Sequence, residues 1–193
     1  MSATQSTMLA LGTQAPDFSL KDVRNDTLFS LKDFAGQKGL LVMFMCAHCP
    51  YVKHIQEEIA RVGNDFVSKG IAVIAISSND AENHPDDGPE GLKAMAEKLG
   101  FNFPYGYDET QSVAKDYRAA CTPEFYLFDQ NQKLYYRGQF DESRPKNTLP
   151  VTGKDLRAAL ESLLKGSPAP TDQKPGLGCN IKWKKGNEPD YFG

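Results

Sequence analysis

Two unbroken apolar runs, separated by an amphipathic segment, dominate the hydrophobic pattern of this chain. Residues 40–45 and 71–76 are continuous apolar runs of a kind typical of buried strands. Between them, apolar residues recur at spacings of three and four, which predicts a helix from about residue 49 to residue 68. Two buried strands joined by a helix pair in parallel, so this stretch predicts a βαβ unit.

Shorter patterned segments flank this unit on both sides. Alternating residues at 18–20 and 28–31 predict a small N-terminal strand pair. Apolar runs on either side of a polar turn, at 125–128 and 134–136, predict an antiparallel hairpin. Helical spacing predicts three further helices, over about residues 92–99, 113–117 and 152–164. The order predicts an α/β fold in which a central mixed sheet is flanked by helices, with an N-terminal β extension.

The composition of the chain changes near residue 167. From there on Pro, Gly, Lys and Asn predominate, and such a segment buries little surface. It nevertheless holds Cys179, Ile181 and the only tryptophan, Trp183. We therefore expect one domain over residues 1–166 and a C-terminal extension over residues 167–193 that packs on it.

The candidate chemistry lies where the first apolar run meets the predicted helix, at Cys46-Ala47-His48-Cys49. Backbone N–H groups at a helix start are unpaired and stabilise a thiolate, which is the reactive form of cysteine. We expect Cys46 to be the nucleophile that attacks a disulfide. Cys49 would then resolve the mixed disulfide from within the same turn.

Composition, net charge and cysteine count limit the partners and the cellular compartment that we consider for this chain. The 193 residues are 40% hydrophobic, enough for one core, and the net charge of -3 gives no electrostatic case for nucleic acid or an anionic membrane surface. No apolar run approaches the roughly 20 residues that cross a bilayer. The first ten residues show no secretory signal, and four cysteines do not suggest a disulfide scaffold. We expect a cytoplasmic protein that uses no cofactor.

Several motifs resemble the thioredoxin fold, and more narrowly its AhpC/TSA (peroxiredoxin-like) branch. The segments that carry the resemblance are residues 12–20, 31–36, 49–52, 121–125 and 178–183. Together they are similar to a group of "thioredoxin family proteins" that look like peroxiredoxins but keep a C-x-x-C. The resemblance implies a thioredoxin-like fold and thiol–disulfide chemistry.

The resemblance also implies roles for residues outside the C-x-x-C. Pro123 matches the cis-proline that faces the dithiol in this fold, and the backbone of Thr122 would then bind an extended peptide or thiol partner. Cys121, two residues before this proline, is either a third thiol near Cys46 or a small buried residue. For Cys179 we favour the buried interpretation.

His48 has two interpretations. Its positive charge would stabilise the thiolate and make the disulfide more oxidising than that of a typical thioredoxin, or it is a solvated surface residue. The acids of the loop that follows, Asp86, Asp87 and Glu90, lack the order of a calcium site, and we expect them to be solvated.

The sequence departs from both parent patterns. The proline and threonine that shape a peroxiredoxin pocket are replaced by Gly39 and Met43, so a hydroxyl for the peroxide is missing there. The buried acid of thioredoxin is replaced by Leu40, so proton transfer from Cys49 would use water or His54.

These observations favour a thiol–disulfide oxidoreductase acting on protein or low-molecular-weight disulfides, supplied with electrons by a thiol reductant or reductase. Three alternatives remain open. The first is a thiol peroxidase that uses Cys46, and the second is a redox sensor that binds a partner through its tail. The third is a structural zinc site of Cys46, Cys49 and Cys121 with His48 or Cys179, although a second half-site spacing is absent. We expect no metal.

Overall fold

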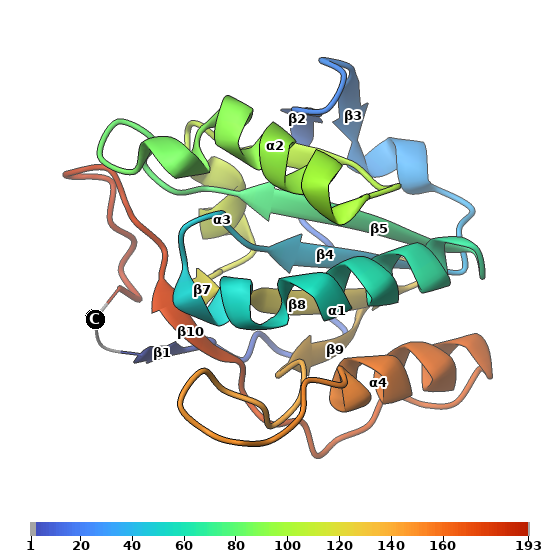
Figure 1. Ribbon diagram of the computed structural model, residues 1–193. Coiled ribbons are helices and arrows are strands. Elements are labelled where there is room, and N and C mark those ends of the chain that lie inside the picture. Colours follow the sequence, from blue (N-terminus) through green and yellow to red (C-terminus); the bar gives the residue numbers. More distant parts are fainter. Residues whose placement is uncertain (1–2, 193) are drawn as a thin grey trace.

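The computed structural model describes residues 3–192 and places a mixed sheet at the centre of the molecule (Figure 1). Its strand order is β6-β5-β4-β8-β9. The strands are β4 (Gly39–Phe44), β5 (Ile71–Ser77), β6 (Tyr105–Tyr107), β8 (Glu124–Asp129) and β9 (Leu134–Gly138). β4 pairs in parallel with β5 and antiparallel with β8, and β8–β9 is the expected hairpin. The predicted βαβ unit and mixed sheet are confirmed.

Helices cover both faces of this sheet. α1 (Pro50–Val67), α2 (Pro89–Leu99) and α4 (Lys154–Leu164) lie on one face, and α3 (Ser112–Asp116) lies on the other (Figure 1). The second face also receives the predicted hairpin β2 (Ser19–Lys21) and β3 (Leu28–Ser30) and the 3₁₀ helix η1 (Leu31–Phe34). A further 3₁₀ helix, η2 (Pro85–Asp87), precedes α2.

α1 is held by its apolar stripe. Val52, Ile59 and Phe66 are each fully buried against the sheet, and burying one such side chain contributes about 1.5–3 kcal/mol. The chain leaves the helix through Gly70, whose φ of 90° suits glycine, and enters β5 one residue later. This packing fixes the start of α1 at the end of β4, where the C-x-x-C lies.

A second sheet, which the sequence analysis does not anticipate, joins the two ends of the chain. Its order is β1 (Ala3–Gln5), β10 (Leu177–Asn180) and β7 (Cys121–Thr122), all antiparallel. Beyond β10, Ile181 is buried in the core cluster that contains α3, and Trp183 packs partly against it. Residues 1, 2 and 193, which belong to the ends of the two predicted segments, lie outside the described residues.

None of the helices between residues 3 and 192 combines the length and the apolar character that crossing a membrane requires.

Candidate active site

The two cysteines of the C-x-x-C occupy different places relative to α1. Cys49 is the N-cap residue of the helix, with Pro50 in the first helical position. Cys46 lies between the end of β4 and the helix, three residues before the cap. Both side chains are fully buried, and all four cysteines are free thiols.

Thr122 contacts both sulfurs from the opposite side. Its hydroxyl lies 3.3 Å from the Cys46 Sγ, and its carbonyl oxygen accepts a hydrogen bond from the Cys49 thiol at 3.2 Å. The peptide bond between Thr122 and Pro123 is cis, as predicted. The structure therefore brings four of the predicted site residues together, Cys46, Cys49, Thr122 and Pro123.

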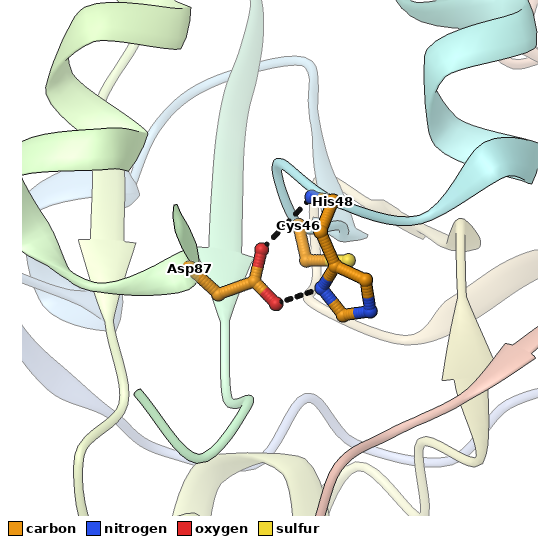
Figure 2. A group of neighbouring side chains, drawn as sticks. All are labelled: Cys46, His48 and Asp87. Carbon is orange, nitrogen blue, oxygen red and sulfur yellow. Dashed lines mark hydrogen bonds and ion pairs between the residues drawn. The ribbon is translucent and has the colours of Figure 1, made fainter. Parts of the chain in front are cut away.

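Asp87 is not the solvated loop residue that the sequence analysis expects. It is fully buried, and its Oδ1 accepts hydrogen bonds from the backbone N–H groups of Ala47 at 2.8 Å and His48 at 3.0 Å. Its Oδ2 accepts a hydrogen bond from the Asn79 side chain at 2.8 Å and pairs with His48 Nδ1 (Figure 2). The expectation was wrong because η2 turns Asp87 inward, while Asp86 and Glu90 remain exposed.

His48 is therefore neither a free cation beside the thiolate nor a fully solvated residue. Its Nδ1 is engaged by Asp87, and its ring stacks on that of His84, with 4.8 Å between centroids and 9° between planes. Burial and the neighbouring His48 lower the pKa of His84. The negative charge of Asp87 lies beside His48 and opposes the effect that a positive His48 would have on the thiolate. The more oxidising potential expected of this pair stays a prediction.

Cys46 and Cys49 titrate as a coupled pair, in which each thiol shifts the pKa of the other. Hydrogen bonds from the Cys179 and Cys46 thiols, followed by the Val52 N–H, lower the pKa of Cys49. The hydrogen bond to Cys49, burial and the charge of Asp87 raise the pKa of Cys46. The Thr122 carbonyl oxygen accepts the Cys49 thiol, and this contact favours the protonated form of Cys49.

The cap residue of α1 is Cys49, and Cys46 lies three residues before it. The expected stabilisation of a reactive thiolate by the helix start stays a prediction.

Cys121 makes its polar contacts with residues outside the C-x-x-C. Its sulfur is 3.9 Å from the Pro123 carbonyl oxygen and 3.9 Å from Glu124 Oε2. Burial raises the pKa of Cys121, and it raises the pKa of the Glu124 carboxyl to about 7. Glu124 accepts the backbone N–H groups of Ala120 at 2.7 Å and Cys121 at 3.2 Å. Cys121 thus packs on the support of the cis-proline segment.

Cys179 is buried, as the sequence analysis favours, and it lies near the C-x-x-C. Cys179 is the strand partner of Thr122 across the β10–β7 pair and belongs to the same core cluster as Cys46 and Cys49. Its hydrogen bond to Cys49 raises the pKa of Cys179. The sequence signal that could have pointed to Cys179 is its place in residues 178–183, one of the segments that carry the family resemblance.

The expected zinc ligands do not gather around one point within residues 3–192. A different trio, Cys46, His48 and Asp87, brings its ligand atoms within 4.8 Å of one another. His48 Nδ1 and Asp87 Oδ2 already pair with each other, so two of the three possible ligand atoms are engaged. A structural zinc site takes four ligands, and this trio offers three. The trio is better explained as a hydrogen-bonded support for the C-x-x-C loop.

A groove runs beside the cis-proline, on the α1 side. It is lined by Tyr51, His54, Pro123, Phe140 and Arg144, among others. His54, considered above as a base, has its Nε2 2.8 Å from the Ser143 hydroxyl, on the wall of this groove. This small groove borders Pro123, the residue that follows Thr122.

The comparisons with known proteins agree with this geometry. The AhpC/TSA family matches residues 11–137. Among curated proteins, a thiol-disulfide oxidoreductase ResA of Geobacillus thermodenitrificans is 24% identical over 160 residues, covering 83% of this chain and 82% of that protein. A thioredoxin-like protein YneN of Bacillus subtilis is 29% identical over 119 residues, covering 62% and 65%.

Solved structures give a closer match. An uncharacterized conserved protein from Geobacillus kaustophilus is 54% identical with a TM-score of 0.93, covering 95% of this chain and 97% of that one. The thioredoxin domain of a Bacteroides vulgatus thiol-disulfide oxidoreductase is 24% identical with a TM-score of 0.62, covering 81% and 99%. The latter shows the fold alone, which is thioredoxin-like as expected.

Proposed function

Since this chain is a member of the AhpC/TSA family, we propose that it is a thiol–disulfide oxidoreductase whose Cys46–Cys49 pair exchanges with disulfides of proteins or small thiols. The observation that carries the proposal is the position of Thr122, which touches both sulfurs from the residue before Pro123. The next residue, Pro123, lines the small groove beside α1. The relatives named thiol-disulfide oxidoreductases support the same chemistry.

The contacts of Thr122 favour Cys46 as the attacking thiolate. The Thr122 carbonyl oxygen accepts the Cys49 thiol, so Cys49 keeps its proton while Cys46 attacks. The Thr122 hydroxyl, 3.3 Å away, stabilises this thiolate. Proton transfer from Cys49 in the later resolving step is still expected to use water or His54.

The exchange then proceeds in two balanced steps. The Cys46 thiolate attacks one sulfur of the substrate disulfide, an S–S bond forms to Cys46, and the other substrate sulfur leaves as a thiolate that takes a proton from water. Cys49, losing its proton, next attacks the Cys46 sulfur of the mixed disulfide. The Cys46–Cys49 disulfide forms and the second substrate thiol departs. A thiol reductant or reductase would restore the dithiol, and a reducing compartment such as the cytoplasm would maintain it.

Asp87 positions this centre. By accepting the N–H groups of Ala47 and His48, it fixes the loop between the cysteines in one conformation. It is a buried acid that reaches the dithiol from η2, whereas the corresponding strand position holds Leu40. We assign it a positioning role, since its carboxylate is fully engaged by four donors.

Trapping the mixed disulfide tests the proposal. With a disulfide-bonded peptide as substrate, Cys49→Ser should accumulate a covalent adduct on Cys46, and Cys46→Ser should lose turnover. Cys121→Ala, whose sulfur contacts only the Glu124 and Pro123 oxygens, is the matched control and should keep turnover. Turnover by Cys46→Ser at the wild-type rate would overturn the assignment.

One observation favours peroxidase activity as a second candidate. The hydroxyl that is missing at Met43 is replaced, from the opposite side, by that of Thr122 at 3.3 Å from the Cys46 sulfur. Rate constants of the reduced protein with hydrogen peroxide and with the disulfide peptide distinguish the two activities. A peroxide rate far above that of a free thiol, lost in Thr122→Val, would establish the peroxidase.

A further inference from the structure

β10 carries a third thiol to the residue that contacts both sulfurs of the C-x-x-C. In the antiparallel β10–β7 pair, Cys179 is opposite Thr122 and Asn180 is opposite Cys121. β10 lies beside β7, near the start of α1 (Figure 1). Cys179 is 3% exposed and shares a core cluster with Cys46 and Cys49.

The approach of β10 to this site requires glycine at position 178. A Cβ at Gly178 would clash with the Thr122 carbonyl oxygen, the same oxygen that accepts the Cys49 thiol. Any larger residue would push β10, and Cys179 with it, away from the dithiol. The sequence Gly178-Cys179 therefore permits close packing and places a nucleophile in the next position.

Cys49 and Cys179 meet at the first turn of α1. Thr122, which is opposite Cys179 in the β10–β7 pair, accepts the Cys49 thiol at its carbonyl oxygen, and each of these two thiols shifts the pKa of the other. The Thr122 backbone thus brings together a thiol from the start of α1 and a thiol from β10. This is the pairing from which thiol–disulfide exchange starts.

We propose that Cys179 is a third redox-active thiol, which attacks the Cys49 sulfur of the Cys46–Cys49 disulfide to form a Cys49–Cys179 disulfide and release Cys46. The step balances within the chain. The Cys179 thiol gives up its proton, an S–S bond forms between Cys179 and Cys49, the Cys46–Cys49 bond breaks, and Cys46 leaves as a thiolate that takes up that proton. No external oxidant or reductant is consumed.

This step rests on the proposed function, which supplies the Cys46–Cys49 disulfide, and it adds a relay to it. After the exchange, the disulfide joins Cys49 at the start of α1 to Cys179 of β10. Cys46, beside Thr122, is again a thiol and can react with a second substrate. The substrates are therefore the same disulfides, and the chain would hold one disulfide while Cys46 enters a mixed disulfide with the next.

Cys121 does not offer the same route. Its sulfur faces the Pro123 carbonyl oxygen and the Glu124 carboxylate, both acceptors. It is thus the internal control for a buried thiol close in sequence to the site.

The test uses the full-length Cys46→Ser protein, which retains three of the four cysteines. The protein is treated with diamide, the remaining thiols are alkylated after denaturation, and the disulfide is located by peptide mapping. We expect a loss of two thiols and a peptide pair that joins Cys49 to Cys179, with Cys121 alkylated. Cys46→Ser/Cys179→Ala should keep both of its thiols, and Cys46→Ser/Cys121→Ala should form the same Cys49–Cys179 bond.

Wild-type protein provides the second measurement, because it needs no substitution that might disturb the fold. Partial oxidation should yield both the Cys46–Cys49 and the Cys49–Cys179 species. Three intact thiols in the Cys46→Ser protein, a Cys49–Cys121 bond, or only intermolecular dimers would overturn the proposal. No substrate is present in this assay, so loss of peptide turnover, which tests the proposed function, is a separate result.

Discussion

The carboxylate of Asp87 holds His48 at two points, the backbone N–H through Oδ1 at 3.0 Å and the ring Nδ1 through Oδ2. The two residues are 39 apart in the sequence, and the contact ties η2 to the loop between the cysteines. Since Asp87 is fully buried, its charge acts on the nearby sulfurs with little screening by water. Asp87, an acid outside the C-x-x-C, therefore affects both the conformation of this loop and the pKa of Cys46.

Replacing Asp87 with Asn should alter both chemistry and stability. The charge of Asp87 helps to raise the pKa of Cys46, so Asp87→Asn should shift the pH profile of Cys46 alkylation to lower pH. Four donors would meet an amide in place of a carboxylate, and we expect a loss of about 1–3 kcal/mol in the free energy of unfolding. Asp86→Asn, at the exposed neighbour, should change neither; an unshifted profile in Asp87→Asn would contradict the assignment.

Thr122→Val removes the hydroxyl near Cys46 and keeps the branched shape of the side chain. The Thr122 hydroxyl lowers the pKa of Cys46, so the valine variant should titrate at higher pH and exchange roughly tenfold more slowly, as expected for one hydrogen bond to a charged group. Thr122→Ser keeps the hydroxyl and should stay near the wild-type rate. Stopped-flow measurement with the disulfide peptide across pH checks both; equal rates in the two variants would exclude a role for the hydroxyl.

Glu124 should make the stability of the protein fall as pH rises. Burial raises its pKa from 4.5 in the unfolded chain to about 7 in the folded protein. Below about 4.5 the carboxyl is protonated in both states, between about 4.5 and about 7 only the folded state keeps the proton, and above about 7 both have lost it. The contribution of Glu124 to the free energy of unfolding therefore decreases by about 1.4 kcal/mol per pH unit between pH about 4.5 and about 7.

The measurement for Glu124 is urea unfolding from pH 4 to pH 8 (roughly the range over which both states titrate). Glu124→Gln cannot titrate, so wild type should lose stability relative to the variant as pH rises. Glu90→Gln, at an exposed position of α2, serves as the control. A constant difference between wild type and Glu124→Gln at every pH would show that Glu124 has the same pKa in both states.

Gly178→Ala tests the close approach of β10. The added methyl group would clash with the Thr122 carbonyl oxygen, so β10 must shift, and we expect a loss of about 1–3 kcal/mol together with faster alkylation of Cys49 and Cys179. Gly176→Ala is matched to it, because a Cβ there meets no atom closer than 3.5 Å. Similar stability and alkylation rates in the two variants would argue against a glycine requirement at position 178.

Local patterns were sufficient to predict the elements that build the scaffold. The apolar runs of β4 and β5 and the helical spacing of α1 reflect burial that each segment carries in its own sequence. The dithiol and the Thr122–Pro123 pair were also predictable, since both lie in short contiguous motifs. Their redox roles remain predictions until the exchange experiments are done.

The contacts that the sequence did not predict join distant segments of the chain. Asp87 belongs to a polar loop and looks solvated, and only the turn of η2 carries it beneath the C-x-x-C. Cys179 lies in a tail rich in Pro and Gly, and its proximity to Cys49 arises from strand pairing with residues 57 positions earlier, as the Cys179–Thr122 register shows. Neither contact leaves a periodic signal in the sequence.

The small sheet β1-β10-β7, which lies beside the C-x-x-C, is expected to open locally without unfolding of the whole domain. It contains only nine residues, three in β1, four in β10 and two in β7, so it has few hydrogen bonds to lose compared with the central sheet. Short edge segments of this kind open locally at a lower free energy than the whole domain unfolds. Because both sulfurs of the C-x-x-C are fully buried, a disulfide reaches them only after a local opening, and we expect β10, which pairs with Thr122, to take part in it. Amide exchange in β10 and the rate of thiol modification should then rise and fall together.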